Sequence, residues 1–135
     1  MTTNAKIERL IDANLNRLRE ALRLLEDVQR YIFDNRELSY TFKELRHKLT
    51  PLFDTKRLEF RDIEGDVAKT STASELERGS LKDMIDANFS RALESARVLE
   101  EAFKLTEPKN SAVAKEIRYK LYGLHKKALA GLVDS

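Results

Sequence analysis

Apolar residues in the first 33 positions recur every three or four residues, which is the spacing of one face of an α-helix. They are Ile7, Leu10, Ile11, Leu15, Leu18, Leu22, Leu25 and Ile32. A shorter series follows a polar break at residues 34–36 and consists of Phe42, Leu45, Leu49 and Leu52. The pattern predicts a long amphipathic helix over about 5–33 and a second helix that Pro51 ends or kinks.

The last third of the chain shows the same periodicity. Ser80 has the position of an N-cap, with Asp83 in the first turn, for a helix that runs to about residue 105. The residues Glu-Pro-Lys-Asn at 107–110 are expected to stop this helix. A last helix is then predicted over about 111–132.

The two halves are copies of one unit. Ile-Asp-Ala-Asn stands at residues 11–14 and again at 85–88. Further along, Arg17, Glu20, Arg23, Leu25 and Glu26 recur as Arg91, Glu94, Arg97, Leu99 and Glu100. Neither helical hairpin can bury its apolar stripe alone, so we expect one all-α domain over residues 1–135. In it the hairpins of about 5–53 and 81–132 pack as a four-helix bundle with a pseudo-two-fold axis.

Polar residues within the repeat indicate a pocket near that axis. On a helical wheel Asn14 falls inside the apolar stripe, and its twin Asn88 has the equivalent place. A buried amide left unpaired costs about 1–3 kcal/mol, so two inward amides favour a polar pocket. The residues at the border of the stripe, which would line its mouth, are Arg17, Arg91, Glu20 and Glu94. The alternative is that the amides cap or bridge within the bundle while the charged residues form interhelical ion pairs.

Other charged positions favour plain surface roles. Further round the wheel, solvated ion pairs are expected for Arg23, Arg97, Glu26 and Glu100. His47 and His125 have no metal-ligating residues near them in the sequence, and we interpret both as surface residues. The basic run on the last helix is interpreted as a solvated face.

The stretch 54–80 is polar and is the one long predicted loop, with a turn of helix favoured at 74–78. Its segment 61–67 carries three carboxylates and Arg61. Carboxylates are ligands that Mg²⁺ prefers, and functional residues are common on loops over a rigid scaffold. The segment is therefore a candidate lid that holds Mg²⁺ and phosphate over the bundle, the alternative being a solvated connection.

Composition narrows the classes of function. The chain has no Cys, which excludes disulfides and thiol chemistry and fits a reducing cytoplasm. Its 25 basic and 23 acidic residues leave a net charge of +2, which does not favour nucleic acid as a partner. No apolar stretch approaches the roughly 20 residues that cross a bilayer, so no membrane association is expected. With four glycines and no P-loop, nucleotide binding through a glycine-rich backbone cradle is excluded.

Taken in order, the segments 11–17, 23–27, 43–47, 61–62 with 66–67, 87–91, 97–101 and 118–122 resemble one family over nearly the whole chain. It is the helical thiamin-biosynthesis domain that is often fused ahead of a thiamin-phosphate synthase barrel and is associated with hydroxymethylpyrimidine phosphate kinase activity. The resemblance implies ATP- and Mg²⁺-dependent phosphorylation of 4-amino-5-hydroxymethyl-2-methylpyrimidine phosphate to the diphosphate. Ala68 stands where the family pattern has Gly. No barrel follows Ser135 in this sequence, so we do not expect this chain alone to make thiamin phosphate.

The resemblance also implies roles for individual residues. The acceptor is already an anionic phosphate, so transfer depends on positioning and charge neutralisation and needs no general base. The implied catalytic residues are Arg17, Glu20, Arg91, Glu94 and Asp62. The implied substrate-binding residues are Asn14, Asn88, Arg61 and Arg118. Mg²⁺ is expected at Asp62 and Asp66, with Glu20 or Glu94 completing the site.

Two other functions are compatible with these patterns. The chain would be a non-catalytic module that docks on a separate thiamin-phosphate synthase, which keeps the basic and amide pocket without needing the loop carboxylates. Alternatively it would be a structural bundle that forms a homodimer. Such a bundle needs neither the polar pocket nor the loop carboxylates.

Overall fold

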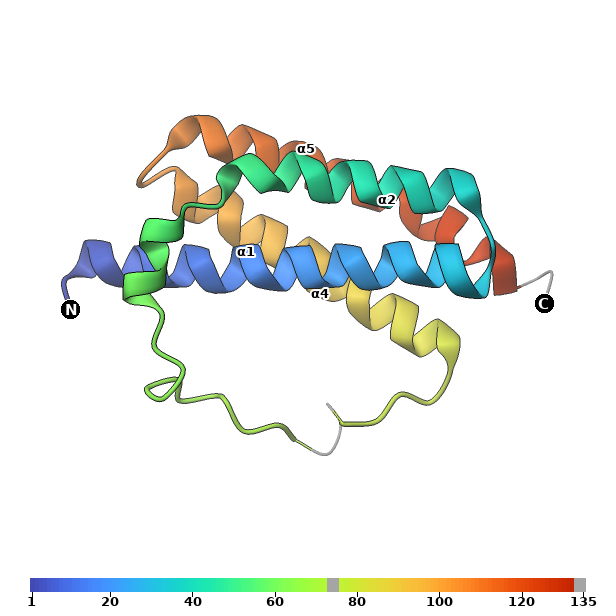
Figure 1. The fold of residues 1–135 in the computed structure, drawn as a ribbon, viewed down its shortest axis with the longest axis horizontal. Helices are drawn as coiled ribbons and strands as arrows, with labels where there is room; N and C mark the ends of the chain where they lie inside the picture. The colour runs from blue at the N-terminus through green and yellow to red at the C-terminus, as the bar shows by residue number, and fades with distance from the viewer. Residues whose placement is uncertain (73–75, 133–135) are drawn as a thin grey trace.

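A computed structural model describes residues 1–72 and 76–132, and in these ranges the chain is all-helical with no strand (Figure 1). The main helices are α1 (Thr3–Asp27), α2 (Arg36–Leu49), α4 (Leu81–Phe103) and α5 (Pro108–Ala128). Short helices of other types are the π-helix η1 (Val28–Ile32) and the 3₁₀ helices η2 (Thr50–Leu52), η3 (Thr55–Phe60) and η4 (Ala130–Leu132). The predicted all-α fold is confirmed. The turn of helix expected at 74–78 begins outside the described residues.

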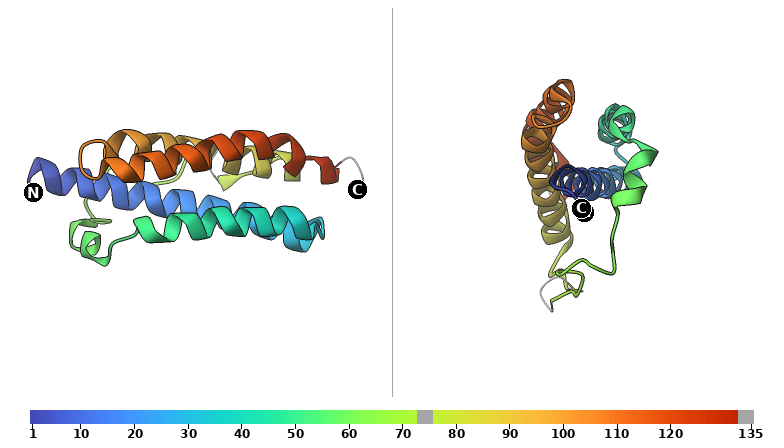
Figure 2. Two further views of the ribbon diagram at one scale, coloured as in Figure 1. Left: turned by 90° about the horizontal axis from the view of Figure 1, so that it is seen from above. Right: turned by 90° about the vertical axis from the view of Figure 1, so that its left-hand side faces the viewer.

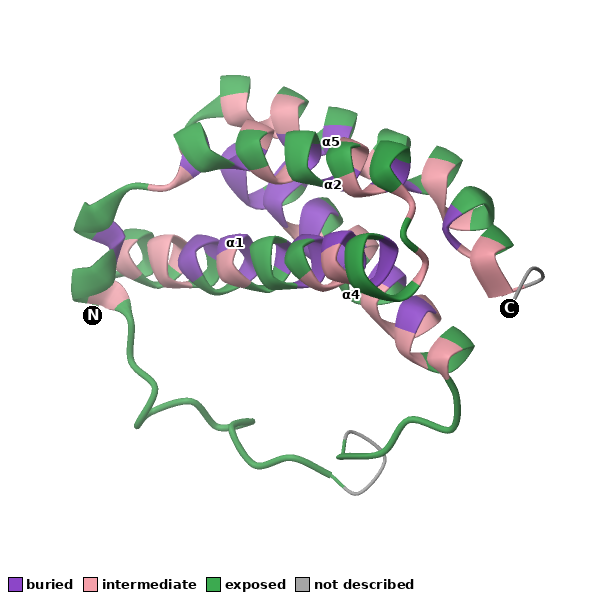
Figure 3. Cartoon of the chain, turned by 45° about the vertical axis from the view of Figure 1, so that its right-hand side comes forward, coloured by how far each residue is buried: buried purple, intermediate pink, exposed green. Residues whose placement is uncertain are grey.

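The helices form a bundle in which α1 packs against both α2 and α4, while α5 packs against α4 and α2. Figure 2 shows α1 lying between α2 on one side and α4 on the other. The apolar faces meet in one core (Figure 3), where the rings of Phe42 and Phe89 make an edge-to-face contact at 5.8 Å. Each hairpin thus covers the stripe that the other exposes.

Polar residues define where the helices begin and end. The side chain of Thr2 accepts a hydrogen bond from the backbone of α1, and Asn35 does the same for α2. The predicted N-cap of α4 is confirmed, because Ser80 Oγ accepts the N–H of Asp83 at 3.1 Å. The predicted break after the first helix occurs at Asp34, whose φ of 51° lies in the left-handed region that stops a helix.

Two boundaries differ from the sequence prediction. The last helix begins at Pro108 rather than at residue 111, because proline suits the first helical position, where no N–H partner is needed. Residues 55–60, expected to be loop, form η3, and the side chain of Asp54 caps it by accepting the N–H of Lys56 at 2.9 Å. The connecting loop is therefore shorter than the predicted 54–80.

The two repeats contain equivalent buried ion pairs. Arg46 Nε bonds Glu26 Oε1 at 3.0 Å, and in the second repeat Arg118 bonds both carboxylate oxygens of Glu100. The prediction that Glu26 and Glu100 are solvated is wrong, since each is only 3% exposed. The reason is that the second helix of each hairpin covers this side of the first and supplies the Arg that compensates the carboxylate. Superposition of the two halves about a two-fold axis stays a prediction.

In the described part of the chain, no helix is both long enough and apolar enough to cross a bilayer.

Candidate functional site

A cavity of about 1160 Å³ lies between α1 and α4, on the side where residues 61–72 leave η3 and run past both helices (Figure 1). Its polar wall is built from both repeats and from the connecting segment. The residues that line it include Asn14, Arg17 and Glu20 from α1, Asn88, Arg91 and Glu94 from α4, and Asp66, Lys69 and Arg78 from the segment. The structure therefore brings together seven of the side chains selected from the sequence, among them Asp66.

Helical spacing explains this convergence. Positions three and four apart lie on one face of a helix, so Asn14 and Arg17 project together from α1. Their equivalents Asn88 and Arg91 project together from α4, which runs in the opposite direction across α1 (Figure 1). Each repeat contributes an amide, a guanidinium and a carboxylate to opposite walls.

The two amides are partly satisfied by their own helices. Asn14, 6% exposed, donates from Nδ2 to the Leu10 carbonyl at 3.0 Å, and half-buried Asn88 donates to the Met84 carbonyl at 2.9 Å. The predicted burial of Asn14 is confirmed. Within residues 1–72 and 76–132 no donor contacts either amide oxygen, so both oxygens are free to accept a hydrogen bond from a ligand.

The charged side chains at the cavity are loosely held. Arg91 Nη2 lies 3.5 Å from Glu20 Oε2, and both side chains are at least half exposed. An exposed pair of this kind contributes about 0–1 kcal/mol, so an anionic ligand can replace the carboxylate. Arg17 and Glu94 have no hydrogen-bond or ion-pair partner among the described residues. The expected interhelical ion pair thus forms for Arg91. For Arg17 no such pair forms among the described residues.

A second cavity of about 560 Å³ adjoins the first, between the N-terminal half of α1 and residues 61–67. Asp62 lines this cavity and not the larger one. The residues that line both cavities are Ala13, Asn14, Arg17 and Asp66. Arg17 therefore stands in the wall common to the two spaces.

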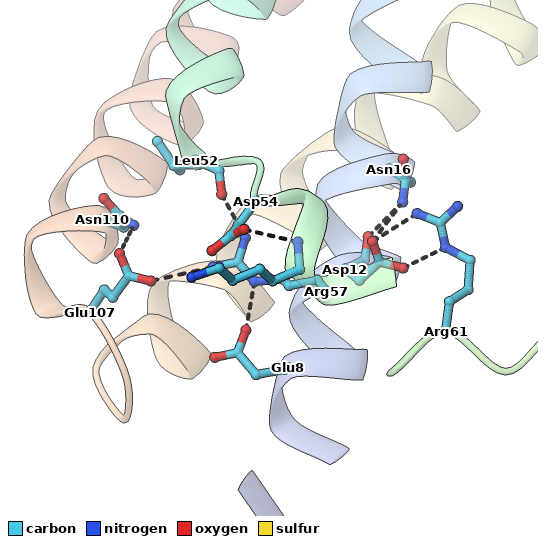
Figure 4. A network of polar contacts seen from close by, with 10 residues as sticks. Glu8, Asp12, Asn16, Leu52, Asp54, Arg57, Arg61, Glu107 and Asn110 are labelled. Atoms are coloured by element: carbon cyan, nitrogen blue, oxygen red, sulfur yellow. Dashed lines mark hydrogen bonds and ion pairs between the residues drawn. The ribbon is translucent and has the colours of Figure 1, made fainter. Parts of the chain in front are cut away.

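Arg61 fixes the start of the connecting segment. Its Nε and Nη2 each lie 2.8 Å from an oxygen of Asp12, which makes a bidentate pair with α1 (Figure 4). These hydrogen bonds raise the pKa of Arg61. Arg9 adds a further contact, donating from Nη2 to the Asp62 carbonyl at 2.8 Å. Arg61 lines the smaller cavity, but its guanidinium is engaged by Asp12 and works as an anchor.

Arg57 is a second anchor, and sequence reasoning missed it. Only 4% exposed, it bonds Glu8 at 2.6 Å, the Leu52 carbonyl at 2.7 Å and Glu107 at 3.4 Å (Figure 4). It thereby ties η3 to α1, to the end of α2 and to the turn before α5. A charged residue in a polar stretch gives no sequence signal of burial, because its burial depends on carboxylates distant in the chain.

The loop carboxylates fit the expected Mg²⁺ as partial ligands. Asp62 Oδ1 accepts the N–H of Gly65 at 2.7 Å, and Asp66 Oδ1 accepts the N–H of Ala68 at 2.9 Å. Each carboxylate keeps one oxygen without a donor in the described part of the chain. In those residues no three metal-ligating side chains gather. A Mg²⁺ ion held here would therefore need further ligands from water or from the phosphates of a substrate.

The backbone conformation of this loop does not require a glycine at residue 68. Among the described residues, Asp34 is the one non-glycine position with positive φ, so Ala68 adopts a conformation open to any residue. Gly65 is different, because an added Cβ would lie 2.3 Å from Asp62 Oδ2. The close approach of Gly65 to Asp62 holds the turn.

Arg118 lies apart from both cavities. It lines a separate space of about 470 Å³ between α4 and α5, and its bonds with Glu100 raise its pKa. Neither histidine lines the two adjoining cavities. His47 is exposed as expected, whereas His125 is half-buried, stacks on Phe89 at 4.3 Å and lies 2.8 Å from Asp86 Oδ1. The interpretation of His125 as a plain surface residue missed these tertiary contacts.

Comparisons with known proteins place this arrangement in a family. The chain is 40% identical over 130 residues to a thiamine-phosphate synthase of Synechocystis sp., covering 96% of this chain and 37% of that protein. It is 39% identical over 119 residues to a thiamine-phosphate synthase of Nostoc punctiforme, covering 87% of this chain and 34% of that protein. The chain thus spans about a third of these relatives, and no solved structure matches it. A sequence model of the ThiD2 family matches residues 9–127, and the chain therefore belongs to the ThiD2 family of thiamin biosynthesis.

Proposed function

We propose that the chain transfers the terminal phosphoryl group of ATP to 4-amino-5-hydroxymethyl-2-methylpyrimidine phosphate and so forms the diphosphate. The observation that carries this proposal is the cavity between α1 and α4, which is lined by Arg17 and Arg91 and by two asparagines whose amide oxygens accept no hydrogen bond from the described residues. Family membership and the relatives' part in thiamin biosynthesis support the pyrimidine as substrate.

The reaction matches what the cavity contains. The second pKa of a phosphate ester is about 6, so the acceptor is mostly dianionic at neutral pH. Its oxygen attacks the γ-phosphorus, the bond from that phosphorus to the bridging oxygen breaks, and ADP leaves with the electron pair. No proton has to be removed, which agrees with a site that neither His47 nor His125 lines.

The side chains of the site position the reactants and neutralise their charge. Arg17 and Arg91 bond phosphate oxygens, and such charge-assisted bonds are the stronger class of hydrogen bond. Asn14 and Asn88 offer amide oxygens that can accept hydrogen bonds from the amino groups of the two ligands. Asp62 and Asp66 would hold Mg²⁺ beside the phosphates, where the ion supplies further charge neutralisation when bound.

The test is an assay of the purified chain with ATP, Mg²⁺ and the pyrimidine phosphate. Chromatography should show equal amounts of ADP and pyrimidine diphosphate. Arg17→Ala should lower kcat/KM by roughly 10²- to 10³-fold, as removal of one donor to developing charge does elsewhere. The matched control is Arg23→Ala, since Arg23 is an exposed arginine of the same helix that lines neither cavity. Absence of diphosphate from a folded protein would overturn the kinase proposal.

A second candidate function is a module that binds the pyrimidine phosphate and delivers it to a synthase. It is favoured by the fact that the chain spans only 34–37% of the relatives named thiamine-phosphate synthase. Binding of the pyrimidine phosphate without binding of ATP would support delivery over catalysis. Binding of neither would leave a structural bundle.

A further inference from the structure

The two adjoining cavities differ in ways that matter for a reaction between two ligands. One is about 1160 Å³ and the other about 560 Å³, and both are within or near the size range of small-molecule sites. Transfer between two ligands requires their reacting atoms to be about 3–3.5 Å apart, so the ligands have to share a boundary. The wall of Asn14, Arg17 and Asp66 is such a boundary.

The available cations differ between the two spaces. Beyond the shared Arg17, the larger cavity has Lys69, Arg78 and Arg91, whose hydrogen bonds within the described residues are solvent-exposed and 3.1–3.5 Å long. In the smaller cavity Arg61 forms a bidentate pair with Asp12, and Arg9 donates one hydrogen bond to the Asp62 carbonyl. A polyphosphate therefore finds more free positive charge in the larger cavity.

Apolar surface forms a larger share of the wall in the smaller cavity than in the larger one. Leu10, Ile63 and Val67 line the smaller cavity although each is exposed to solvent. Exposed aliphatic side chains around a small cavity provide the apolar contact that a flat aromatic ring gains from leaving water. Lys6, whose side-chain ammonium has no partner in residues 1–72 or 76–132, supplies a cation for a single phosphate beside them.

We propose that the nucleoside triphosphate occupies the larger cavity and the pyrimidine phosphate the smaller one, with the phosphoryl group crossing between them at Arg17. This inference rests on the proposed kinase function. Arg17 is the side chain suited to contact both ligands, because it stands in the common wall and has no protein partner among the described residues. The two repeats then have unequal roles: α1 contacts both ligands and α4 only the nucleotide.

Calorimetric titrations with two probes test the assignment, using a non-hydrolysable ATP analogue with Mg²⁺ and, separately, the pyrimidine monophosphate. Lys6→Met should raise the Kd of the pyrimidine phosphate by roughly 10- to 100-fold and leave that of the nucleotide unchanged. Arg91→Met should do the reverse. Arg17→Met should weaken both ligands.

A second line uses the apolar wall. Ile63→Ser should weaken the pyrimidine phosphate alone, and because Ile63 is exposed the variant keeps the fold. Arg23→Met serves as the control that changes neither affinity. The assignment would be overturned, even if the chain is a kinase, by either of two results. One is that each variant weakens the opposite ligand to the one expected, and the other is that the two probes compete for one site. If the wild-type chain binds neither probe, the proposed function itself fails.

Discussion

Buried charge in this protein is held in compensated pairs. Glu26 and Glu100 are nearly inaccessible, and each is bonded by an arginine of the neighbouring helix. Taking a carboxylate out of water is costly, and an arginine bonded to it offsets that cost. These pairs are therefore requirements of the bundle, while the loosely held Arg17 and Arg91 are available for a ligand.

Replacing Arg118 by Leu should lower the free energy of unfolding by up to about 3–5 kcal/mol, because the buried Glu100 would keep only its longer, 3.7 Å ion pair with the exposed Arg97. Urea denaturation measures the change. Arg23→Ala, which breaks an exposed pair with Asp27, should cost about 0–1 kcal/mol. Arg118→Leu should retain kcat/KM at temperatures where it is folded. If Arg118→Leu lost activity while its free energy of unfolding stayed at the wild-type value, Arg118 would be a substrate-binding residue.

Selectivity for the phosphorylated substrate also depends on individual residues. If an arginine of the cavity grips the phosphate already on the pyrimidine, the unphosphorylated alcohol leaves that arginine unpaired. It also presents a neutral hydroxyl where no histidine is at hand to deprotonate it. We expect kcat/KM for the alcohol to be lower by roughly 10⁴-fold. Comparable specificity constants for the two compounds would mean that these arginines do not recognise phosphate.

Among the elements, the connecting segment depends most on contacts outside itself. Residues 61–72 are all exposed, so none of their apolar side chains is buried in the core. Their starting point is set by Arg57 and Arg61, which fasten this end of the segment to α1 (Figure 4). Changes in the segment should accordingly affect activity more than stability.

Gly65→Ala tests the turn that carries the loop carboxylates. The new Cβ would lie 2.3 Å from Asp62 Oδ2, so the exposed Asp62 carboxylate should turn away from residue 65, and turnover should fall if that carboxylate holds Mg²⁺, with the melting temperature nearly unchanged. Gly123→Ala is the matched control, because a Cβ there meets nothing within 4 Å in the interior of α5. It should stabilise the protein by about 0.5–1 kcal/mol and leave turnover unaffected.

Asp62→Asn and Asp66→Asn address the carboxylates directly. Each keeps the size of the side chain and its hydrogen bond to the loop backbone but removes the charge. Turnover should fall and the Mg²⁺ concentration for half-maximal rate should rise, while thermal unfolding is unchanged. Equal losses of activity and stability would show that these carboxylates are structural.

The contact between the first turns of α4 and the end of α5 should depend on pH. The bond from Lys82, and then that from His125, lowers the pKa of Asp86. A carboxylate with a lowered folded-state pKa stabilises the fold above its unfolded pKa of about 3.9 and loses this contribution as pH falls through the lower folded value. Asp86→Asn should thus melt below the wild type at pH 5, and the difference should shrink as the pH falls below about 3.9. A difference that stays constant as the pH falls would contradict the ionic origin.

For the whole molecule, the repeat means that neither hairpin is complete. Leu18 and Leu22 of α1 are fully buried because α4 packs on α1. An isolated fragment of residues 1–53 should therefore have little helix by circular dichroism at low micromolar concentration and gain helix as concentration rises. The full chain should show concentration-independent helix. A fragment that melts cooperatively as a monomer would show that one repeat is a domain by itself.

The fold class and much of the site were determined by local pattern. Helical periodicity alone places Asn14 in the stripe and Arg17 at its edge, and duplication places their twins on the second long helix. The chemistry of Ser80 at an N-cap is likewise local, which is why that boundary was predicted correctly.

Only the tertiary structure decided which charges are buried and which are free. Glu26, Arg57 and Arg118 carry the same kind of sequence signal as Arg17, a charged side chain on or beside a helix. They differ because another helix covers the first three and supplies partners from distant parts of the chain, whereas Arg17 faces a cavity. Burial of a charge is a property of the surroundings that packing creates, and no local spacing encodes it.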